Sequence, residues 1–303
     1  MNVAAALANW GVPVTYFTAM PRNYLSNEIM IHLEKKGIDT ERIMLQGNRI
    51  GAYFIGEGAD LKHAAVIYDR AGSSFSTIEP GTIDWDRLFN GVSWFHFSAI
   101  NPAISELSAA ICLEAAREAH ERGLFVSIDL NYRQKLWQWG KQPVEVMPRI
   151  IEYCNLVMGN PWALDIMTGI GDLQGFEATK ENCRELTHNM YNTLLKRFSN
   201  VQTLAFTFRF DKADVNGKDH LHYFGVLCNE EECLVSKEYQ IDDIVDRVGT
   251  GDSFMAGLIY SKLNKQSMQE AVNFAAAAAV TKFSIRGDSN TSTVEEINRY
   301  AGN

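Results

Sequence analysis

The sequence predicts an α/β protein built on a mostly parallel sheet with helices on both faces, together with a small β lid. From residue 92 onward, apolar runs of strand length alternate with longer segments of helical spacing, which is typical of a parallel sheet covered by helices. By contrast, residues 49–57 and 64–70 are two β-type runs joined by a polar turn, and no helix follows either run. We therefore expect one domain over residues 1–303, with lid strands at about residues 48–71.

The composition excludes several classes of partner. The chain has 303 residues, of which 46% are hydrophobic and 21% charged, values that are ordinary for a globular protein. Its formal net charge is −9 and it has no Lys/Arg cluster, which argues against a nucleic-acid partner. No segment is apolar for long enough to span a membrane. The sequence therefore favours small molecules as ligands.

Cysteine usage and the N-terminus indicate a cytoplasmic protein. The five cysteines are Cys112, Cys154, Cys183, Cys228 and Cys233. They form no C-x-x-C pair, and we expect free thiols and no metal site. The N-terminus lacks the basic and apolar regions of a secretory signal.

The segment before the lid predicts short elements of both kinds. Residues 1–10 form an apolar helix that ends at Gly11, because glycine readily adopts the left-handed conformation at a helix C-terminus. Residues 12–17 are expected to form a strand. Residues 27–36 then predict a second helix, and residues 42–45 the entry to another strand.

After the lid, strands and helices follow in regular order. We expect strands at residues 92–97, 125–130, 156–158 and 201–208. We expect helices at residues 104–122, 144–153, 175–195, 268–283 and 293–300. A charged turn at residues 211–219, a hairpin of residues 222–226 and 234–238, and a strand entering a loop at residues 239–245 complete the pattern.

The most informative stretch is DRVGTGDSF at residues 246–254. Apolar residues at helical spacing follow it, so the turn that contains Gly249 and Gly251 opens a helix whose free N–H groups can bind an anion. Asp252 beside such a site can take a proton from a hydroxyl that attacks a phosphate, or it can simply cap the helix. A dinucleotide-binding fingerprint would need a third glycine where this chain has Phe254.

These nine residues resemble the C-terminal signature of the ribokinase-like (PfkB) carbohydrate kinases, usually Asp-Thr-x-Gly-Ala-Gly-Asp-Ser-Phe. Arg247 stands in place of the usual Thr, and Thr250 in place of the usual Ala. The resemblance implies that Asp252 is the catalytic base. It implies a backbone anion hole at three residues, which are Gly249, Thr250 and Gly251.

Two further stretches resemble the 2-keto-3-deoxygluconate kinases of this family. They are YDRAGSS at residues 68–74 and the D-x-N-x-R pattern at residues 129–133. The resemblance implies sugar-acid contacts from Asn2, Tyr53, Tyr68, Arg70 and Arg133. Arginine suits a carboxylate because it is permanently charged and can donate two parallel hydrogen bonds. From the residues alone, a solvated strand edge and a structural Arg–Asp pair remain alternatives.

The resemblance also implies ATP and Mg²⁺. Asn160 matches the first residue of the family's Asn-x-x-Glu, but Ala163 replaces the Glu and Asp165 lies two residues further on. Nucleotide contacts are implied for Asn160, Thr207, Arg209 and Asn273. Asp246 is the expected metal residue.

Taken together, the resemblance implies ATP-dependent phosphorylation of the terminal hydroxyl of 2-keto-3-deoxygluconate. A fructokinase-type or ribokinase-type enzyme for a neutral sugar is the alternative, although it would leave Arg70 and Arg133 without an anion. An inactive sugar-binding relative is another, because the family's Gly-Gly pair and first strand have no counterpart before Asn2 and we expect that strand to be lacking. The expected partners are a sugar acid, a nucleotide and a second copy of the chain in a dimer through the lid.

Overall fold

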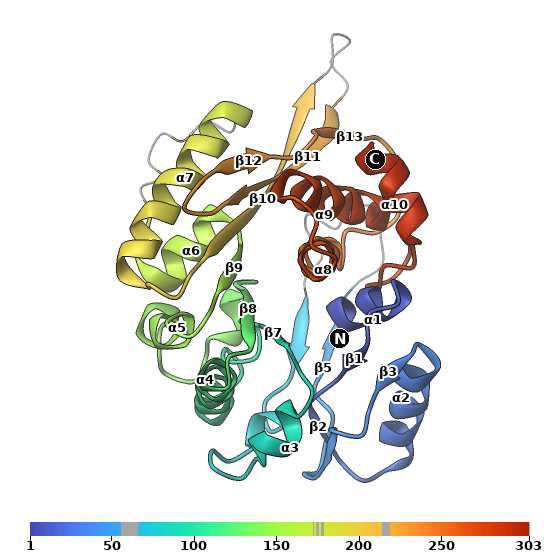
Figure 1. Ribbon diagram of the computed structural model, residues 1–303. Helices are drawn as coiled ribbons and strands as arrows, with labels where there is room; N and C mark the ends of the chain where they lie inside the picture. Colours follow the sequence, from blue (N-terminus) through green and yellow to red (C-terminus); the bar gives the residue numbers. More distant parts are fainter. Residues whose placement is uncertain (56–65, 172, 174–175, 177–178, 214–218, 303) are drawn as a thin grey trace.

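A seven-stranded sheet crosses the middle of the computed structural model, which describes residues 1–55, 66–171, 173, 176, 179–213 and 219–302 (Figure 1). The strands are β7 (Trp94–Ser98), β8 (Phe125–Asp129), β9 (Leu156–Gly159), β10 (Thr203–Ala213), β11 (Asp219–Cys228), β12 (Cys233–Val235) and β13 (Tyr239–Ile241). Strands β7 to β10 are parallel neighbours, whereas β11 runs antiparallel to β10 and pairs antiparallel with both β12 and β13. The predicted α/β fold is confirmed, with a parallel half and an antiparallel half.

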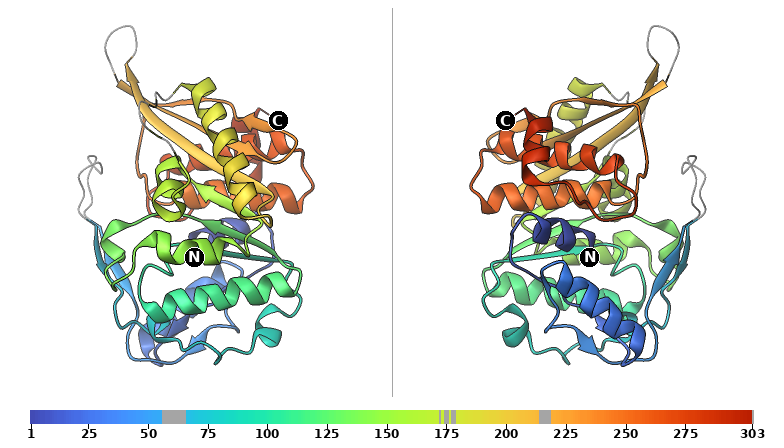
Figure 2. Two further views of the ribbon diagram at one scale, coloured as in Figure 1. Left: turned by 90° about the vertical axis from the view of Figure 1, so that its left-hand side faces the viewer. Right: turned by 90° about the vertical axis from the view of Figure 1, so that its right-hand side faces the viewer.

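Helices cover both faces of this sheet (Figure 2). On one face lie α4 (Glu106–Glu121), α5 (Pro143–Ile151), α6 (Pro161–Thr168) and α7 (Lys180–Arg197); on the other lie α1 (Asn2–Asn9), α8 (Thr250–Leu263), α9 (Met268–Phe283) and α10 (Val294–Ala301). Successive strand residues alternate between the two cores: Val157 packs on the α4–α7 side, and Met158 on the α8–α10 side. Within the described residues, no helix combines the length and apolar character that a membrane span requires.

A smaller part of the molecule, below the sheet in Figure 1, contains short strand pairs and two helices. Its elements are β1 (Val14–Thr15), β2 (Ala19–Met20), α2 (Tyr24–Lys35), β3 (Ile38–Asp39), β4 (Met44–Leu45) and α3 (Trp85–Phe89). β1 pairs with β3 and β2 with β4, both parallel. Helix α2 begins three residues before its predicted start because the Asn23 side chain caps it, accepting a hydrogen bond from the Ser26 N–H.

Further elements differ from the predicted ones. The predicted strand at residues 12–17 is reduced to β1, since only two of its residues pair with β3. The predicted turn at residues 211–219 is wrong at both ends, because Asp211–Ala213 and Asp219 continue the β10–β11 ladder despite their charge; residues 214–218 lie outside the described part. Helix α6 was not predicted, although Asn160 and Pro161 are typical of a helix start.

The two strands predicted for the lid are present, and their role as a lid stays a prediction. β5 (Ala52–Phe54) and β6 (Ile67–Asp69) form an antiparallel two-stranded sheet apart from the central one. The turn between them, residues 56–65, lies outside the described residues. Whether the whole chain is a single domain stays a prediction.

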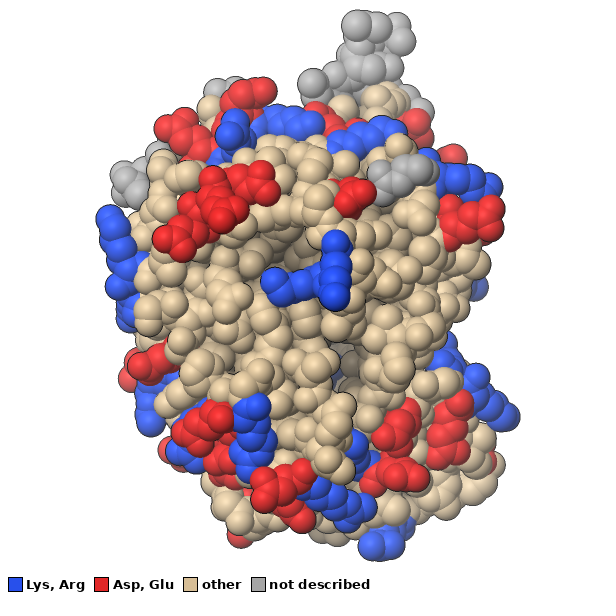
Figure 3. Space-filling model, viewed as in Figure 1, with Lys and Arg blue, Asp and Glu red and all other residues tan. Residues whose placement is uncertain are grey.

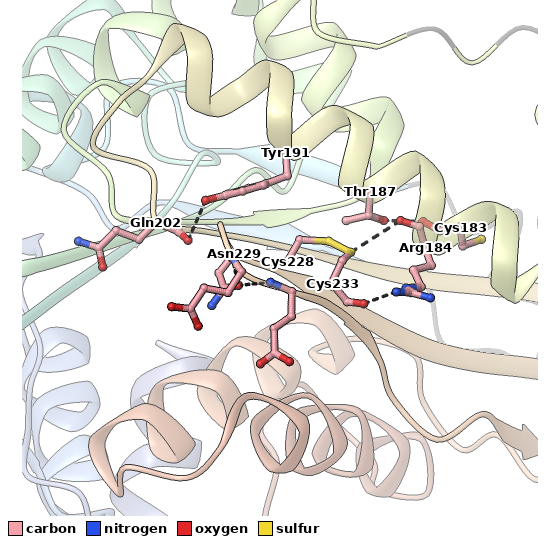
Figure 4. Close-up of a disulfide and its surroundings, with 10 residues drawn as sticks. Cys183, Arg184, Thr187, Tyr191, Gln202, Cys228, Asn229 and Cys233 are labelled. Carbon is pink, nitrogen blue, oxygen red and sulfur yellow. Dashed lines mark hydrogen bonds between the residues drawn. A yellow bond between two sulfur atoms is a disulfide. The ribbon is translucent and has the colours of Figure 1, made fainter.

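The expectation of five free thiols is wrong. Cys228 and Cys233 form a disulfide between β11 and β12 (Figure 4), while Cys112, Cys154 and Cys183 are free and buried. The physical reason is register, because antiparallel pairing places these two residues directly opposite each other. Their spacing in the sequence gave no C-x-x-C motif from which this could be predicted.

Candidate active site

The predicted anion site lies at the start of helix α8. Gly249 caps the helix with φ 80°, and a Cβ at this position would lie 2.0 Å from the backbone oxygen of Asp288. Both observations require glycine. The N–H groups of Gly249, Thr250 and Gly251 have no acceptor in the described part of the chain; the first helical acceptor, the Gly249 carbonyl, binds the Ser253 N–H at 2.9 Å. The turn therefore presents unpaired donors at the positive end of a helix.

Nothing within the described part of the protein itself requires a glycine at position 251. A Cβ there would meet the described residues only at Met158 Cε, 4.0 Å away, and no left-handed φ is involved. The space above this residue is open. A phosphate that approaches the helix start would use that space.

The Asp252 carboxylate is held in the first turn of α8 by a residue far away in sequence. Asn2 Nδ2 donates a hydrogen bond to Asp252 Oδ2 at 3.0 Å, because helix α1 packs against α8. The other carboxylate oxygen is thereby oriented. The structure thus brings together the predicted base and one predicted substrate residue.

Asp246, the predicted metal residue, uses both carboxylate oxygens for backbone contacts. It accepts hydrogen bonds from the Val248 N–H at 2.9 Å and from the Gly287 N–H at 3.0 Å. These bonds join the anion-binding turn to the loop at residues 284–288. Among the described residues, no group of three or more His, Cys, Asp or Glu side chains could hold a metal. A metal role for Asp246 stays a prediction.

The lid contributes an arginine between two tyrosines. The Arg70 guanidinium lies 5.6 Å from the ring centre of Tyr53 and 5.7 Å from that of Tyr68, distances typical of cation–π contacts. Burial lowers the pKa of Arg70, and the positive charge of Arg133 acts in the same direction. The two predicted substrate arginines are therefore near enough to interact.

The lid also reaches across the site. The Tyr53 hydroxyl donates to Asp288 Oδ2 at 3.2 Å. Burial, followed by the negative charge of Asp288, raises the pKa of Tyr53 to about 12. The sequence did not predict this contact, since nothing in the chain links residues 235 positions apart.

A second carboxyl group lies close to Asp252. Asp129, at the end of β8, is 5% exposed, and its side chain accepts from the Asn131 N–H at 3.1 Å. Burial and then the charge of Asp252 raise the pKa of Asp129 to about 7, while the Asn131 bond and Arg133 oppose the shift. The D-x-N-x-R motif and the start of α8 therefore meet at one site, at the carboxyl end of a parallel strand.

Among the predicted nucleotide residues, Arg209 carries a buried positive charge, whereas Asn160 and Asn273 use their side-chain oxygens in hydrogen bonds within the protein. Arg209 on β10 has a lowered pKa because of burial first and the nearby charge of Arg247 second, with Arg133 adding to it. By contrast, Asn160 Oδ1 caps helix α6 through the Ala163 N–H at 2.9 Å. Asn273 on α9 accepts from the Lys237 N–H at 3.1 Å.

Arg247 was noted in the sequence only as a departure from the usual Thr, and the structure shows that it adds positive charge beside Arg209. Thr207 lies in β10 two residues before Arg209. Figure 3 shows a small group of basic side chains at the centre of the face in view, with most acidic side chains toward its rim. The arrangement fits the phosphates of a nucleotide. The described residues offer no cage of side chains for Mg²⁺, an ion that takes much of its coordination from phosphates and water.

Comparison with known proteins gives a consistent picture. The family model described as "pfkB family carbohydrate kinase" matches residues 1–201 and 217–294 of this chain. A 2-dehydro-3-deoxygalactonokinase of Haloferax volcanii is 25% identical over 303 residues, which are 98% of this chain and 85% of the relative. A 2-dehydro-3-deoxygluconokinase of Dickeya dadantii is 23% identical and covers 90% of this chain and 81% of its own length. The crystal structure of the 2-dehydro-3-deoxygluconokinase of Thermotoga maritima superposes with a TM-score of 0.87 at 33% identity, covering 100% of this chain and 89% of that one.

Proposed function

Because the chain belongs to the pfkB family of carbohydrate kinases, we propose that it transfers the terminal phosphoryl group of ATP to the terminal hydroxyl of 2-keto-3-deoxygluconate or a close stereoisomer. That it is a phosphotransferase with an alcohol acceptor follows from the family. The choice of a sugar acid is the proposal. It rests on one observation: the Arg70 guanidinium lies between the rings of Tyr53 and Tyr68, at 5.6 and 5.7 Å, and the charge of Arg133 is near enough to act on it.

Two neighbouring arginines are unfavourable without an anion between them. Neither Arg70 nor Arg133 forms an ion pair with a carboxylate of the described residues. A sugar acid would supply the missing negative charge, and a neutral sugar would not. The relatives that act on 2-dehydro-3-deoxy sugar acids support this choice.

In the proposed reaction, Asp252 takes the proton from the sugar hydroxyl as its oxygen bonds to the terminal phosphorus of ATP. The bond between that phosphorus and the bridging oxygen breaks, and ADP leaves. Asn2 holds Asp252 in orientation through its 3.0 Å hydrogen bond. The N–H groups of Gly249, Thr250 and Gly251 stabilise the negative charge on the oxygens of the transferred group.

The nucleotide side of the site is proposed to include Arg209 on β10 and Arg247 in the turn before α8, whose charges lie near enough to act on each other. Mg²⁺ would supply positive charge that neutralises the phosphates, and Asp246 is the residue proposed to lie near it. Thr207, Asn160 and Asn273 remain proposed nucleotide contacts, the last two with hydrogen bonds that already fix their side-chain oxygens. These fixed oxygens leave their amide N–H groups as the ones to face a ligand.

The lid has a further proposed role in dimer formation. Its outward residues include Phe54, 59% exposed, and Ile67, 63% exposed, which pair across the two strands. Exposed apolar side chains on a short sheet are typical of an interface. Sedimentation of the protein at several concentrations tests whether a dimer forms, and an Ile67→Lys variant tests whether the lid holds it.

The substrate proposal is tested by measuring ATP-dependent phosphorylation of matched acceptors. We expect the highest kcat/KM for 2-keto-3-deoxygluconate or its galactonate stereoisomer, and much lower values for fructose and ribose. Comparable values for the neutral sugars would contradict the sugar-acid proposal and favour a fructokinase-type or ribokinase-type enzyme. Turnover with none of these acceptors would favour a sugar-binding protein.

A further inference from the structure

We propose that Asp288 is a positioning residue that couples the lid to the anion-binding turn, so that the lid closes only onto a correctly formed helix start. This inference rests on the proposed kinase function and deepens it. The lid is the β5–β6 sheet, and the turn is residues 246–251. Asp288 contacts the lid with its side chain and the turn with its backbone.

The side-chain half of the coupling is the hydrogen bond from the Tyr53 hydroxyl to Asp288 Oδ2 at 3.2 Å. β5 belongs to a two-stranded sheet apart from the central one, so it depends on contacts of this kind for its position. A hydrogen bond to a charged acceptor is among the stronger ones available to it. Tyr53 therefore anchors one lid strand to the body of the protein.

The backbone part of the coupling is the close packing of the Asp288 main chain against the main chain of Gly249. The Asp288 carbonyl oxygen lies where a Cβ of residue 249 would be, 2.0 Å from that ideal position. The preceding residue, Gly287, donates its N–H to Asp246 Oδ2, and Asp246 Oδ1 accepts from the Val248 N–H. A displacement of the Asp288 backbone would therefore be transmitted directly to the turn.

The loop that carries Asp288 is itself well fixed. The buried Lys282 donates from Nζ to the Ile285 carbonyl at 2.8 Å, and the Phe283 carbonyl accepts from the N–H groups of Val245 and Asp246 at 2.8 and 3.1 Å. Such a loop cannot adjust freely to a moving lid. The position of Tyr53 is thus set by the same residue that packs against the phosphate site.

The sugar side joins this chain of contacts through Tyr53. Its ring lies 5.6 Å from the Arg70 guanidinium, the group proposed to bind the substrate carboxylate. A sugar acid bound at Arg70 would therefore influence the position of Tyr53 and, through the hydrogen bond of Tyr53, that of Asp288 and the turn. The arrangement links the acid group of one substrate to the phosphate site of the other, and lid closure would exclude water from both.

The first test measures lid opening without any substrate, by amide hydrogen exchange of residues 52–54 and 67–69. We expect Asp288→Ala and Tyr53→Phe each to speed exchange roughly 10-fold, the effect of losing one hydrogen bond to a charged group. The double variant should exchange no faster than either single one, because both changes remove the same bond. Asp288→Asn, which keeps an acceptor oxygen, should restore most of the protection.

A matched control is Lys135→Ala, which removes another hydrogen bond between the lid and the body, from Lys135 Nζ to the Val66 carbonyl at 3.3 Å. Its effect on exchange should add to that of Tyr53→Phe. In the kinetic assay, Asp288→Ala should raise KM for the sugar acid and lower kcat together, whereas Lys135→Ala should leave kcat unchanged.

Two results would overturn the coupling. One is exchange at the wild-type rate in both Asp288→Ala and Tyr53→Phe; the other is additive effects in the double variant. Because exchange is measured without substrate, a wild-type chain that phosphorylates no sugar would refute the kinase proposal and still leave the contact tested. Conversely, wild-type exchange in both variants of a chain that phosphorylates sugars would refute the coupling alone.

Discussion

The two glycines of the anion-binding turn should respond in opposite ways to the same substitution. Gly249 is left-handed, with φ 80°, and a Cβ there would overlap the Asp288 oxygen at 2.0 Å. Gly251 has an open environment, with Met158 Cε at 4.0 Å as the nearest atom that its Cβ would meet. Gly249→Ala and Gly251→Ala therefore separate a glycine that the protein requires from one that a ligand requires.

For Gly249→Ala, the left-handed backbone alone costs about 1–2 kcal/mol. With a change of about 2–4 °C in Tm per kcal/mol, this lowers Tm by roughly 2–8 °C, and the overlap with Asp288 adds to the loss. For Gly251→Ala, the smaller entropy of the unfolded chain makes the change neutral or stabilising by up to about 1 kcal/mol. Its Tm should therefore equal or exceed that of the wild type.

Although Gly251→Ala should not lower Tm, it should lower the phosphorylation rate. A methyl group at this position would occupy the space proposed for the phosphoryl oxygens, and displacement of a reacting group by about 1 Å can lower the rate on the order of 10²-fold. The assay is thermal unfolding together with steady-state kinetics at saturating sugar acid and varied ATP. A Gly251→Ala variant with wild-type kcat and KM would refute the proposed anion hole, and one as unstable as Gly249→Ala would refute the structural argument.

Three further predictions concern charged residues of the site. Asp252→Asn should keep the wild-type Tm and lower kcat about 10²–10⁴-fold, the usual effect of losing a general base; near-normal turnover would exclude Asp252 from that role. Arg70→Ala and Arg133→Ala should each weaken binding of a sugar acid by about 1.5–3 kcal/mol and change binding of a neutral sugar of equal length much less, as calorimetry can show; equal losses would argue against a carboxylate ligand. Asp129 has its pKa raised from 3.8 to about 7, so between these values the folded state holds a proton that the unfolded state has released, and wild-type stability should fall as the pH rises across this window. Asp129→Asn should lose that dependence, so the Tm of the variant relative to wild type should increase from pH 4 to pH 7; a constant difference would contradict the raised pKa.

Local pattern was sufficient for much of this fold. The start of α8 at Gly249 and the capping box of α10, in which Thr293 and Glu296 bind each other's backbone N–H groups, follow from short-range chemistry. The boundaries of β10 did not, because pairing with β11 continues through Asp211, where the residue type favours a turn. The disulfide of Cys228 and Cys233 was missed for the same reason, since it depends on register across the hairpin.

The site itself could be predicted only in part. The motif at residues 246–254 named Asp252 and its turn, since the chemistry lies within one short stretch. Asp129 and Asp288 lie in stretches that resemble family motifs, but no role was predicted for either residue, because their significance comes from contacts with Asp252, Tyr53 and the turn that only folding creates. Asp246 was expected near a metal from the family resemblance; its two oxygens accept hydrogen bonds from backbone N–H groups, and the metal role stays a prediction.

The distribution of charge is relevant to how an acidic protein could bind the two anionic substrates proposed for it. The chain has a net charge of −9, yet Arg70, Arg133, Arg209 and Arg247 gather around the site. None of the four forms an ion pair with a carboxylate of the described residues. Burial lowers the pKa of both Arg70 and Arg209, and the positive charge of Arg133 adds to the shift of each. Like charges held together in this way destabilise the free protein, and each bound anion relieves part of that repulsion. A carboxylate at Arg70 and phosphates at Arg209 would therefore assist each other's binding through Arg133, which interacts with both.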